Sequence, residues 1–544
     1  MSTPAPAKAI TYTDWRAQVE KDILAKNPKG SFEKSYVAKT SEGIAVQPLY
    51  TDADVAGLDA AASFIRASRL PKGGWQWTPL DKPETCPCED PASDPVAALL
   101  LTGSLEKTFA ANFDELAARV KNNPGARQAA VTACIYHEAA ANAVQELAFA
   151  LATAVAYTRE LAARGIPAET ALNAIRTEFA VGVDFFMEVS KLRAYRLLWA
   201  NVAAAFNASA KTAFIGARTA LWDKTVLDHH VNLLRLTTEA MSAVVGGCDT
   251  LLIRPFDGVG QEPTELGKRM SKNLHDLLAD EFSLAQAMDP AGGSYYVEKL
   301  TDELARNAWK LFQDIEAKGG MIAAVKSGYV QSLVAAAAKE KQKLVDSRRR
   351  VFLGTTLQPN LKDKPPQTAP KPPCAAAGQA AAETAEKLVR RRGAEDFETV
   401  RAAGDAFAAK NNGQRATVFL ARMGPPKQHK ARADFSTGFM SIGGFEIAKG
   451  ASGFASADEA AQAAANSGAP IAILCSTDDT YPELVPAFAK KLKELSPKTA
   501  ILVAGAPGEN EAAWRAAGVN EFINIRSNVR TTLAQLQKLA GVIA

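Results

Sequence analysis

Short apolar runs alternate with longer amphipathic stretches over most of the chain. Between residues 95 and 355, runs of strand length occur at PVAALLLTG, QAAVTACIY, KTAFIGA, DTLLIRPF and RRVFLGT. Helical patterns separate these runs, for example over residues 138–165 and 183–206. Apolar strands that alternate with helices are typical of parallel sheets. The pattern favours a (β/α)8 TIM-type barrel over residues 91–356, and an open doubly wound sheet is the alternative. Strands rich in Val, Leu, Ile, Ala and Phe predict a barrel filled with side chains, without a tunnel along its axis.

A second alternation occupies residues 415–544. Its strand candidates are ATVFLAR, GFEIAKG, PIAILCS, TAILVAG and EFINI, with helical stretches between them. Five strands in a segment of this length match a small flavodoxin-like α/β domain.

The remaining segments read as an arm and a linker. Residues 1–90 offer a helix over Trp15–Leu24, a short strand in GIAVQPLY and a helix cap at Thr51. The segment has too few apolar residues for a core of its own, so we expect it to lie across a neighbouring domain or subunit. Residues 357–414 begin with a Pro-rich linker, and a helical segment is expected over residues 381–410.

Composition excludes several classes of function. Of 544 residues, 47% are hydrophobic and 22% charged, with a formal net charge of +4, so nothing favours nucleic acid or an anionic membrane as partner. No run of eighteen apolar residues predicts a membrane span, and the start of the chain lacks a signal-peptide pattern. We expect a cytoplasmic protein with reduced thiols. A metal site at Cys86 and Cys88 is the alternative, but no second ligand pair stands nearby.

Two longer motifs point to a family. They are FAVGVDFFMEVSKLRAYRLLWA at residues 179–200 and MDPAGGSYYVEKLTDELARNAW at residues 288–309, where Gly292 and Gly293 permit a tight turn. Their order and spacing resemble the methylmalonyl-CoA mutase family of adenosylcobalamin-dependent enzymes. The apolar positions of the first motif also suit an ordinary core face, at Phe185, Phe186, Leu192 and Leu198.

The chain departs from this family where the chemistry should lie. Active members carry a motif close to HSQTSGW, and this chain has GARTALW, so Gly216 and Arg218 replace the histidine and the glutamine, while Thr219 and Trp222 match. Glycine cannot donate a hydrogen bond to a substrate carbonyl. A second motif, like TQSLHTNALDE, corresponds to CDTLLIRPFDG. Leu251, Leu252 and Ile253 replace its polar residues, and Asp257 is retained as a cap or loop anchor.

A third site lacks its tyrosine. Active members have a substrate-side tyrosine before the first barrel strand, yet no tyrosine lies between Tyr50 and Tyr136 here. The corresponding region offers Arg66, Arg69, Trp75 and Trp77. The arginines suit surface or interface pairs, with phosphate binding as the alternative.

The C-terminal segment shows the same loss. Cobalamin-binding members have D-x-H-x-x-G after the first strand, and the three positions are here Pro426, Gln428 and Ala431. His429 stands one residue late, flanked by Lys427 and Arg432 where an aspartate and a glycine would stand, and we expect a solvent-facing loop histidine. A Gly-Gly pair of the family becomes Gly505-Ala506.

The resemblance therefore implies a small (β), non-catalytic subunit of a heterodimeric methylmalonyl-CoA mutase. Its large subunit would hold adenosylcobalamin and interconvert methylmalonyl-CoA and succinyl-CoA. This chain would then have no catalytic, cofactor-binding or metal-binding residue, and its first residues would form an arm around the partner. A divergent active mutase and a mutase-derived regulatory or assembly protein are the alternatives.

Overall fold

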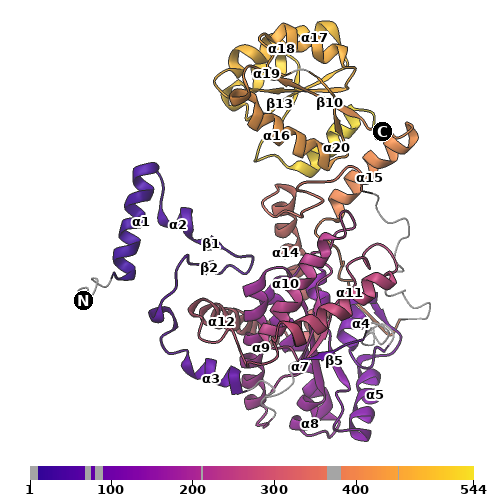
Figure 1. Ribbon diagram of the computed structural model, residues 1–544. Helices are drawn as coiled ribbons and strands as arrows, with labels where there is room; N and C mark the ends of the chain where they lie inside the picture. The colour runs from indigo at the N-terminus through magenta and orange to yellow at the C-terminus, as the bar shows by residue number, and fades with distance from the viewer. Residues whose placement is uncertain are drawn as a thin grey trace.

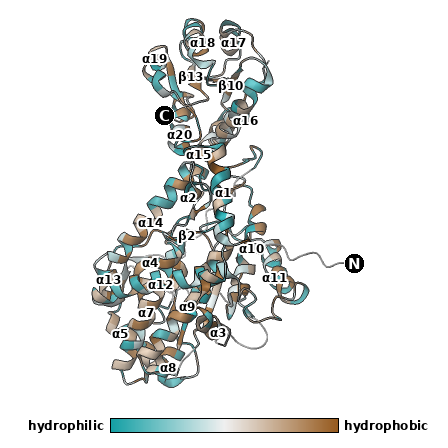
Figure 2. Ribbon diagram, turned by 90° about the vertical axis from the view of Figure 1, so that its left-hand side faces the viewer, coloured by the Kyte–Doolittle hydropathy of each residue, from teal (hydrophilic) through white to brown (hydrophobic). Residues whose placement is uncertain are grey.

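The computed structural model describes residues 10–67, 75–79, 90–209, 212–363, 381–450 and 452–543. They form an N-terminal arm (residues 10–58), a first α/β unit and a C-terminal α/β unit. Helix α15 (Glu395–Lys410) lies between the two units in both views (Figure 1, Figure 2). No single helix in these ranges is long and apolar enough to cross a membrane. The helix pair Gly320–Lys326 and Tyr329–Asp346, bent by 69°, passes that test of length and composition only when taken together.

The arm consists of short elements with little packing of their own. They are α1 (Tyr12–Lys26), α2 (Phe32–Tyr36), the antiparallel pair β1 (Ala38–Lys39) and β2 (Ala45–Val46), and the 3-10 helix η1 (Asp52–Val55). Thr11 caps α1, and Thr51 forms a capping box with Asp54, as expected for that position. Figure 1 shows α1 and α2 standing away from the first unit, and no residue of α1 is buried. The turn between β1 and β2 contacts the first unit, because Asn142 donates a hydrogen bond to the Ser41 carbonyl and Ile44 belongs to the core of that unit.

The first unit begins with α3 (Asp59–Ala67). Its strands are β3 (Gln76–Trp77), β4 (Ser104–Leu105), β5 (Ala129–Val131), β6 (Ile175–Val181), β7 (Ile215–Thr219), β8 (Thr250–Leu252) and β9 (Glu383–Thr384). Its helices are α4 (Pro95–Thr102), α5 (Phe109–Asn122), α6 (Cys134–Glu138), α7 (Ala143–Ala163), α8 (Ala168–Asn173), α9 (Phe185–Ala205), α10 (Val231–Gly246), α11 (Glu265–Asp276), the π-helical turn η2 (Leu277–Glu281), α12 (Tyr295–Ala317), α13 (Gly320–Lys326) and α14 (Tyr329–Asp346).

The main sheet of this unit has five strands in the order β3-β8-β7-β6-β5, and every neighbouring pair is parallel. Helices connect successive strands from β5 to β8, which confirms an α/β architecture. Among the described residues this sheet has five strands rather than eight, so its closure into a barrel remains a prediction.

One predicted strand is wrong. The run PVAALLLTG forms helix α4, because Asp94 caps its first turn by accepting a hydrogen bond from the Ala97 amide, and Pro95 suits the first helical position. Gly103 ends the helix in the left-handed region, with φ of 81°. A short, fully apolar run does not distinguish a buried helix from a buried strand.

Two other predicted elements also differ. The run RRVFLGT forms no strand and contributes only a single bridge between Leu353 and Leu357. The helix expected over residues 381–410 begins at Glu395, because residues before it are extended and β9 pairs with β4. Conversely, β6 was not predicted, since its first residues alternate polar and apolar side chains.

The C-terminal unit contains a second parallel sheet of five strands. Its elements are β10 (Thr417–Arg422), α16 (Pro426–Ile442), β11 (Glu446–Ile447), α17 (Ala457–Asn466), β12 (Ile471–Cys475), α18 (Tyr481–Leu495), β13 (Ala500–Val503), η3 (Gly508–Asn510), α19 (Glu511–Ala516), β14 (Val519–Phe522) and α20 (Val529–Leu539). All five predicted strands are present, in the order β11-β10-β12-β13-β14. Counted along the chain this order is 2-1-3-4-5, which is common in doubly wound sheets.

The two α/β units share part of one apolar core. Trp222 and Phe352 of the first unit belong to the same buried cluster as Val418 and Ile471 of the C-terminal sheet. Phe397 of α15 joins this cluster between them. The unit boundary is therefore a packed junction.

Candidate functional site

The two faces of the first sheet differ in chemistry. Thr177 and Phe179 of β6 contact Tyr195 of α9, so this face of the sheet is covered by helices. The opposite face carries Glu178 of β6, which pairs in register with Gly216 of β7. Since side chains alternate along a strand, Arg218 lies on the same face as Gly216. The helix-covered face of β6 is thus packed into the core, whereas the opposite face of β6 and β7 carries charged residues.

An ion pair occupies the positions predicted to face a substrate. The guanidinium of Arg218 contacts the carboxylate of Glu178, and Arg176 lies 3.5 Å from the same carboxylate. The side chain of Glu178 is 4% exposed and that of Arg218 16% exposed. Gly216 is buried beside them without a side chain of its own. The charged side chains on this face are therefore paired with one another.

Thr219 and Trp222, the residues that match the family motif, serve the structure. The Thr219 hydroxyl accepts a hydrogen bond of 2.9 Å from the amide of Arg254, whose guanidinium reaches Glu138 at 2.6 Å. The Trp222 ring is buried at the unit junction, with the Arg350 guanidinium 4.4 Å from its centre.

The second predicted site is mostly core. Leu251 and Ile253 are fully buried, and Leu252 pairs in register with Arg218, so Leu252 lies on the same face as that arginine. Asp257 is a loop anchor, as predicted, because its carboxylate accepts hydrogen bonds from the amide and hydroxyl of Thr264, the residue that caps α11.

The two long motifs meet at one arginine. Arg193 of α9 is fully buried, and its guanidinium lies 2.9 Å from the carboxylate of Asp289 and 2.7 Å from that of Glu298. Glu298 also accepts a hydrogen bond from the amide of Gly293, whose φ is 88°. The turn at Gly292 and Gly293 is thus held against α9. Within the first motif, Leu192 and Leu198 are core residues, whereas Phe186 is exposed.

The D-x-H-x-x-G positions of the C-terminal unit lie in a helix. Helix α16 begins at Pro426, so Gln428 and Ala431 stand in its first two turns. The side chain of Gln428 packs against Gly424, where an added Cβ would come within 1.9 Å of the Gln428 Oε1. His429 is only 6% exposed, which corrects the expectation of a solvent-facing loop residue. Its Nδ1 lies 3.0 Å from the Gly424 carbonyl oxygen, which needs a donor at the end of β10.

Side-chain contacts fill the space between the loops that follow β12 and β13. The Tyr481 hydroxyl donates a hydrogen bond of 2.8 Å to the Ala504 carbonyl and accepts one from the Ser476 amide. A Cβ at Gly505 would come within 2.9 Å of the Tyr481 ring. Arg432 of α16 reaches across to Asp478 at 2.9 Å.

Comparison with known proteins places these residues in a family. The sequence profile described as Methylmalonyl-CoA mutase matches residues 80–421. The chain belongs to the methylmalonyl-CoA mutase family. It is 38% identical over 402 residues to the methylmalonyl-CoA mutase small subunit of Streptomyces virginiae, covering 74% of this chain and 64% of that protein. It is 34% identical over 427 residues to the small subunit of Porphyromonas gingivalis, covering 77% and 67%.

Similarity extends to a mutase whose name does not mention a small subunit. The methylmalonyl-CoA mutase of Rhizobium meliloti is 37% identical over 298 residues, which are 53% of this chain and 41% of that protein. The relatives therefore include proteins named as small subunits and a protein named simply as methylmalonyl-CoA mutase.

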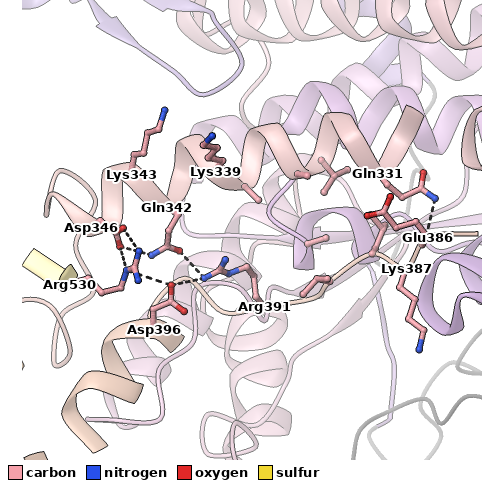
Figure 3. Close-up of a pocket in the computed structure, with 16 residues that line it drawn as sticks. Gln331, Lys339, Gln342, Lys343, Asp346, Glu386, Lys387, Arg391, Asp396 and Arg530 are labelled. Carbon is pink, nitrogen blue, oxygen red and sulfur yellow. Dashed lines mark hydrogen bonds and ion pairs between the residues drawn. The ribbon is translucent and has the colours of Figure 1, made fainter. Parts of the chain in front are cut away.

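A hollow at the unit junction of this mutase-family chain has a volume of about 570 Å³. Helix α14 and residues 386–391 line it, with Asp396 of α15 and Arg530 of α20 at one end (Figure 3). Figure 3 shows Arg530 between Asp346 and Asp396, and Arg391 beside Gln342. Val334, Ala338 and Leu388 supply an apolar lining. The charged groups at this end bind one another and join the units.

Sequence reasoning missed a buried charged group in α9. Lys191 has no exposed side-chain surface, and its Nζ lies 2.7 Å from Glu146 and 2.5 Å from Glu188. Burial alone would lower the pKa of Lys191, but these carboxylates outweigh it and raise that pKa to about 12. The i,i+3 spacing of Glu188 and Lys191 was the available signal.

Several predicted sites lie outside the described residues. They are Cys86, Cys88, Arg69 and the side chain of Arg66. Trp75 and Trp77 are described, and both rings contact His275, at 5.7 and 5.1 Å. Cys134, Cys248 and Cys475 are buried thiols that form no disulfide. Over the described ranges, no group of three His, Cys, Asp or Glu side chains could hold a metal ion.

Proposed function

We propose that this chain is the non-catalytic small subunit of a cytoplasmic, heterodimeric methylmalonyl-CoA mutase. Its partner large subunit would hold adenosylcobalamin and interconvert methylmalonyl-CoA and succinyl-CoA. The chain would stabilise that subunit with a (β/α)8 barrel and a flavodoxin-like domain that both descend from an active mutase. The relatives named small subunit support this assignment.

The ion pair between Arg218 and Glu178 is the observation on which the proposal rests. In active members this face would present a histidine and a glutamine to the substrate thioester. Here Gly216 supplies no donor, and Arg218 is bound to Glu178 on the adjacent strand. A donor that is already engaged cannot polarise a carbonyl unless the pair is first broken. The pair therefore supports a structural role for this sheet.

The geometry of α16 argues against a cobalamin ligand in this chain. A cobalt-binding histidine needs a free ring nitrogen, a carboxylate behind it and an open approach. Gln428 has no imidazole, and Pro426 has no carboxylate. The nearby His429 is buried, with its Nδ1 against the Gly424 carbonyl. These residues do not fit a cobalamin site, which supports placing the cofactor in the partner.

The arm offers a surface for that partner. Ile10 is 78% exposed and Leu24 51% exposed, and α1 buries no residue in this chain. The arm is held to the first unit along residues 41–50, by the hydrogen bond from Asn142 to the Ser41 carbonyl, the burial of Ile44 in the core and the stacking of Tyr50 on Tyr296. Its apolar side chains would be buried on association with the large subunit.

Coexpression tests the proposal. The chain would be produced alone and together with a family member that contains D-x-H-x-x-G, and mutase activity measured in each preparation. We expect a 1:1 complex that is active and a single chain that is inactive. Mutase activity of the single chain with adenosylcobalamin would show instead that it is a divergent enzyme. Failure to form a complex would favour a regulatory or assembly role.

A further inference from the structure

A second cavity, of about 320 Å³, lies in the C-terminal unit between β10 and α16. It is lined by Leu420, Arg422, Pro426, His429, Lys430, Ala433, Asp434 and Thr437. Arg422 is the last residue of β10 and pairs in register with Cys475, the last residue of β12. The cavity thus adjoins the carboxyl ends of the two strands at which the strand order reverses. Doubly wound sheets bind ligands at this place, beyond the carboxyl ends of the strands.

Arg422 has an unusual environment for an arginine. Its guanidinium makes no hydrogen bond or ion pair within the described residues, although it lines the cavity and its Nε is buried. Two other arginines in and next to this unit are paired, Arg415 with Asp405 at 2.7 Å and Arg432 with Asp478 at 2.9 Å. A buried donor without a partner is unfavourable, so the site is incomplete as it stands.

No neighbouring carboxylate is free to neutralise Arg422. Asp434 is the single acidic residue that lines the cavity, and it binds Lys430 at 3.0 Å on the exposed side. The position that would hold the aspartate of D-x-H-x-x-G is Pro426, which also lines the cavity. The Nδ1 of His429 contacts the Gly424 carbonyl oxygen. The side chains that line the cavity therefore leave one positive charge, that of Arg422, without a counter-charge.

We propose that Arg422 anchors a binding site for a small oxyanion, a phosphate ester or a carboxylate. The planar fork of a guanidinium donates two parallel hydrogen bonds to adjacent oxygens of either group. A cavity of this size accommodates the anion together with a small organic part of its molecule. The site does not depend on the proposed subunit role, because all its residues lie in this chain.

Calorimetric titration of the full-length chain with inorganic phosphate and with acetate tests the proposal. We expect saturable binding of at least one anion, weakened at least ten-fold by Arg422→Gln, and the tighter anion identifies the class. Arg526→Gln is the matched control, since Arg526 is exposed on the same unit and should change affinity less than about two-fold.

A reciprocal variant guards against misfolding of Arg422→Gln. Pro426→Asp places a carboxylate in the first turn of α16, where acidic residues are favourable, at the same cavity that Arg422 lines. This variant should fold and lose anion binding. The proposal is overturned if the wild-type chain binds neither anion up to about 50 mM, a range that reaches even very weak sites. It also fails if Arg526→Gln weakens binding as much as Arg422→Gln, or if Pro426→Asp binds as the wild type does.

Discussion

Arg530 and Asp346 form an ion pair with two hydrogen bonds, each 2.9 Å long, between the guanidinium and the carboxylate. The pair joins α20 of the C-terminal unit to the last residue of α14 in the first unit (Figure 3). Arg530 also lies 3.8 Å from Asp396 of α15. One side chain therefore links three elements at the unit junction.

Replacing Arg530 with Met should loosen this junction. Asp346 is 7% exposed and would keep the neutral side chains of Gln342 and Asn528 as partners but lose its bidentate cation, while Arg530 itself is partly exposed. We expect a loss of about 1–2 kcal/mol in the free energy of unfolding, measured by urea denaturation. The Arg526→Met variant should stay within about 0.5 kcal/mol of the wild type. An equal loss in both variants would contradict a specific role for the pair.

Removing Arg218 tests whether its ion pair is structural. In Arg218→Met the buried Glu178 carboxylate loses its close cation and retains Arg176 at 3.5 Å, so we expect a loss of about 2–3 kcal/mol in unfolding free energy. Adding Glu178→Gln should recover part of this loss, because the uncompensated charge is then gone. Activity of the complex per mole should be unchanged. A large fall in activity at unchanged stability would point to a catalytic arginine.

Lys341 predicts a pH dependence of stability. It is buried, donates a hydrogen bond of 2.7 Å to the Ala141 carbonyl, and burial lowers its pKa to about 8 from an ordinary 10.5. Between these values the unfolded chain binds the proton more tightly, so the contribution of Lys341 to stability rises with pH. The gap corresponds to about 3 kcal/mol.

The Lys341→Met variant isolates this contribution. The unfolding free energy of the wild type minus that of the variant should increase by about 3 kcal/mol between pH 7.5 and 10.5. Lys339→Met is the control on the same helix, because Lys339 is exposed, and its difference from the wild type should not change over that range. A flat difference for Lys341→Met would disprove the lowered pKa.

The chain alone should not retain cobalamin. After incubation with adenosylcobalamin and gel filtration we expect a colourless protein, both for the wild type and for Gln428→His. A histidine in the first turn of α16 would still lack a carboxylate behind it, since Pro426 precedes it. A partner subunit that contains D-x-H-x-x-G serves as the positive control. A histidine-ligated cobalamin spectrum on this chain would refute the assignment.

Deletion of residues 1–60 should weaken the heterodimer. The arm has little packing of its own, and burial of apolar area contributes roughly 25 cal/mol per Å² before ordering costs are subtracted. We expect a folded truncated chain that no longer holds the large subunit at micromolar concentration, measured by analytical ultracentrifugation, and a corresponding fall in mutase activity. A tight, fully active complex of the truncated chain would show that the arm is dispensable.

The strands that sequence patterns located are apolar runs bounded by turns. Residues 215–219, 250–252 and all five strands of the C-terminal unit were found in this way. The same rule failed at residues 95–102, where the Asp94 cap and Pro95 start a helix in a run that is apolar on every side. Helix and strand share this composition when both are fully buried.

The candidate site could be located from the sequence, but its content could not. Motif positions led to Gly216 and Arg218, which indeed lie on one strand face. The partner Glu178 was missed because β6 was not recognised as a strand, and pairing between strands is not visible in a single sequence. Similarly, His429 was expected in a loop, but α16 already begins at Pro426. His429 therefore lies in the helix, where it is buried.

The apolar cluster that contains Trp222 and Val418 bears on how the chain unfolds. Since residues of both α/β units contribute to this single cluster, opening the junction would expose part of the core of each. Small domains joined by a flexible linker usually melt independently, whereas units that share buried surface lose structure together. Cleavage after Asp363 would then leave the two fragments bound to one another, as a noncovalent pair that melts in one cooperative step.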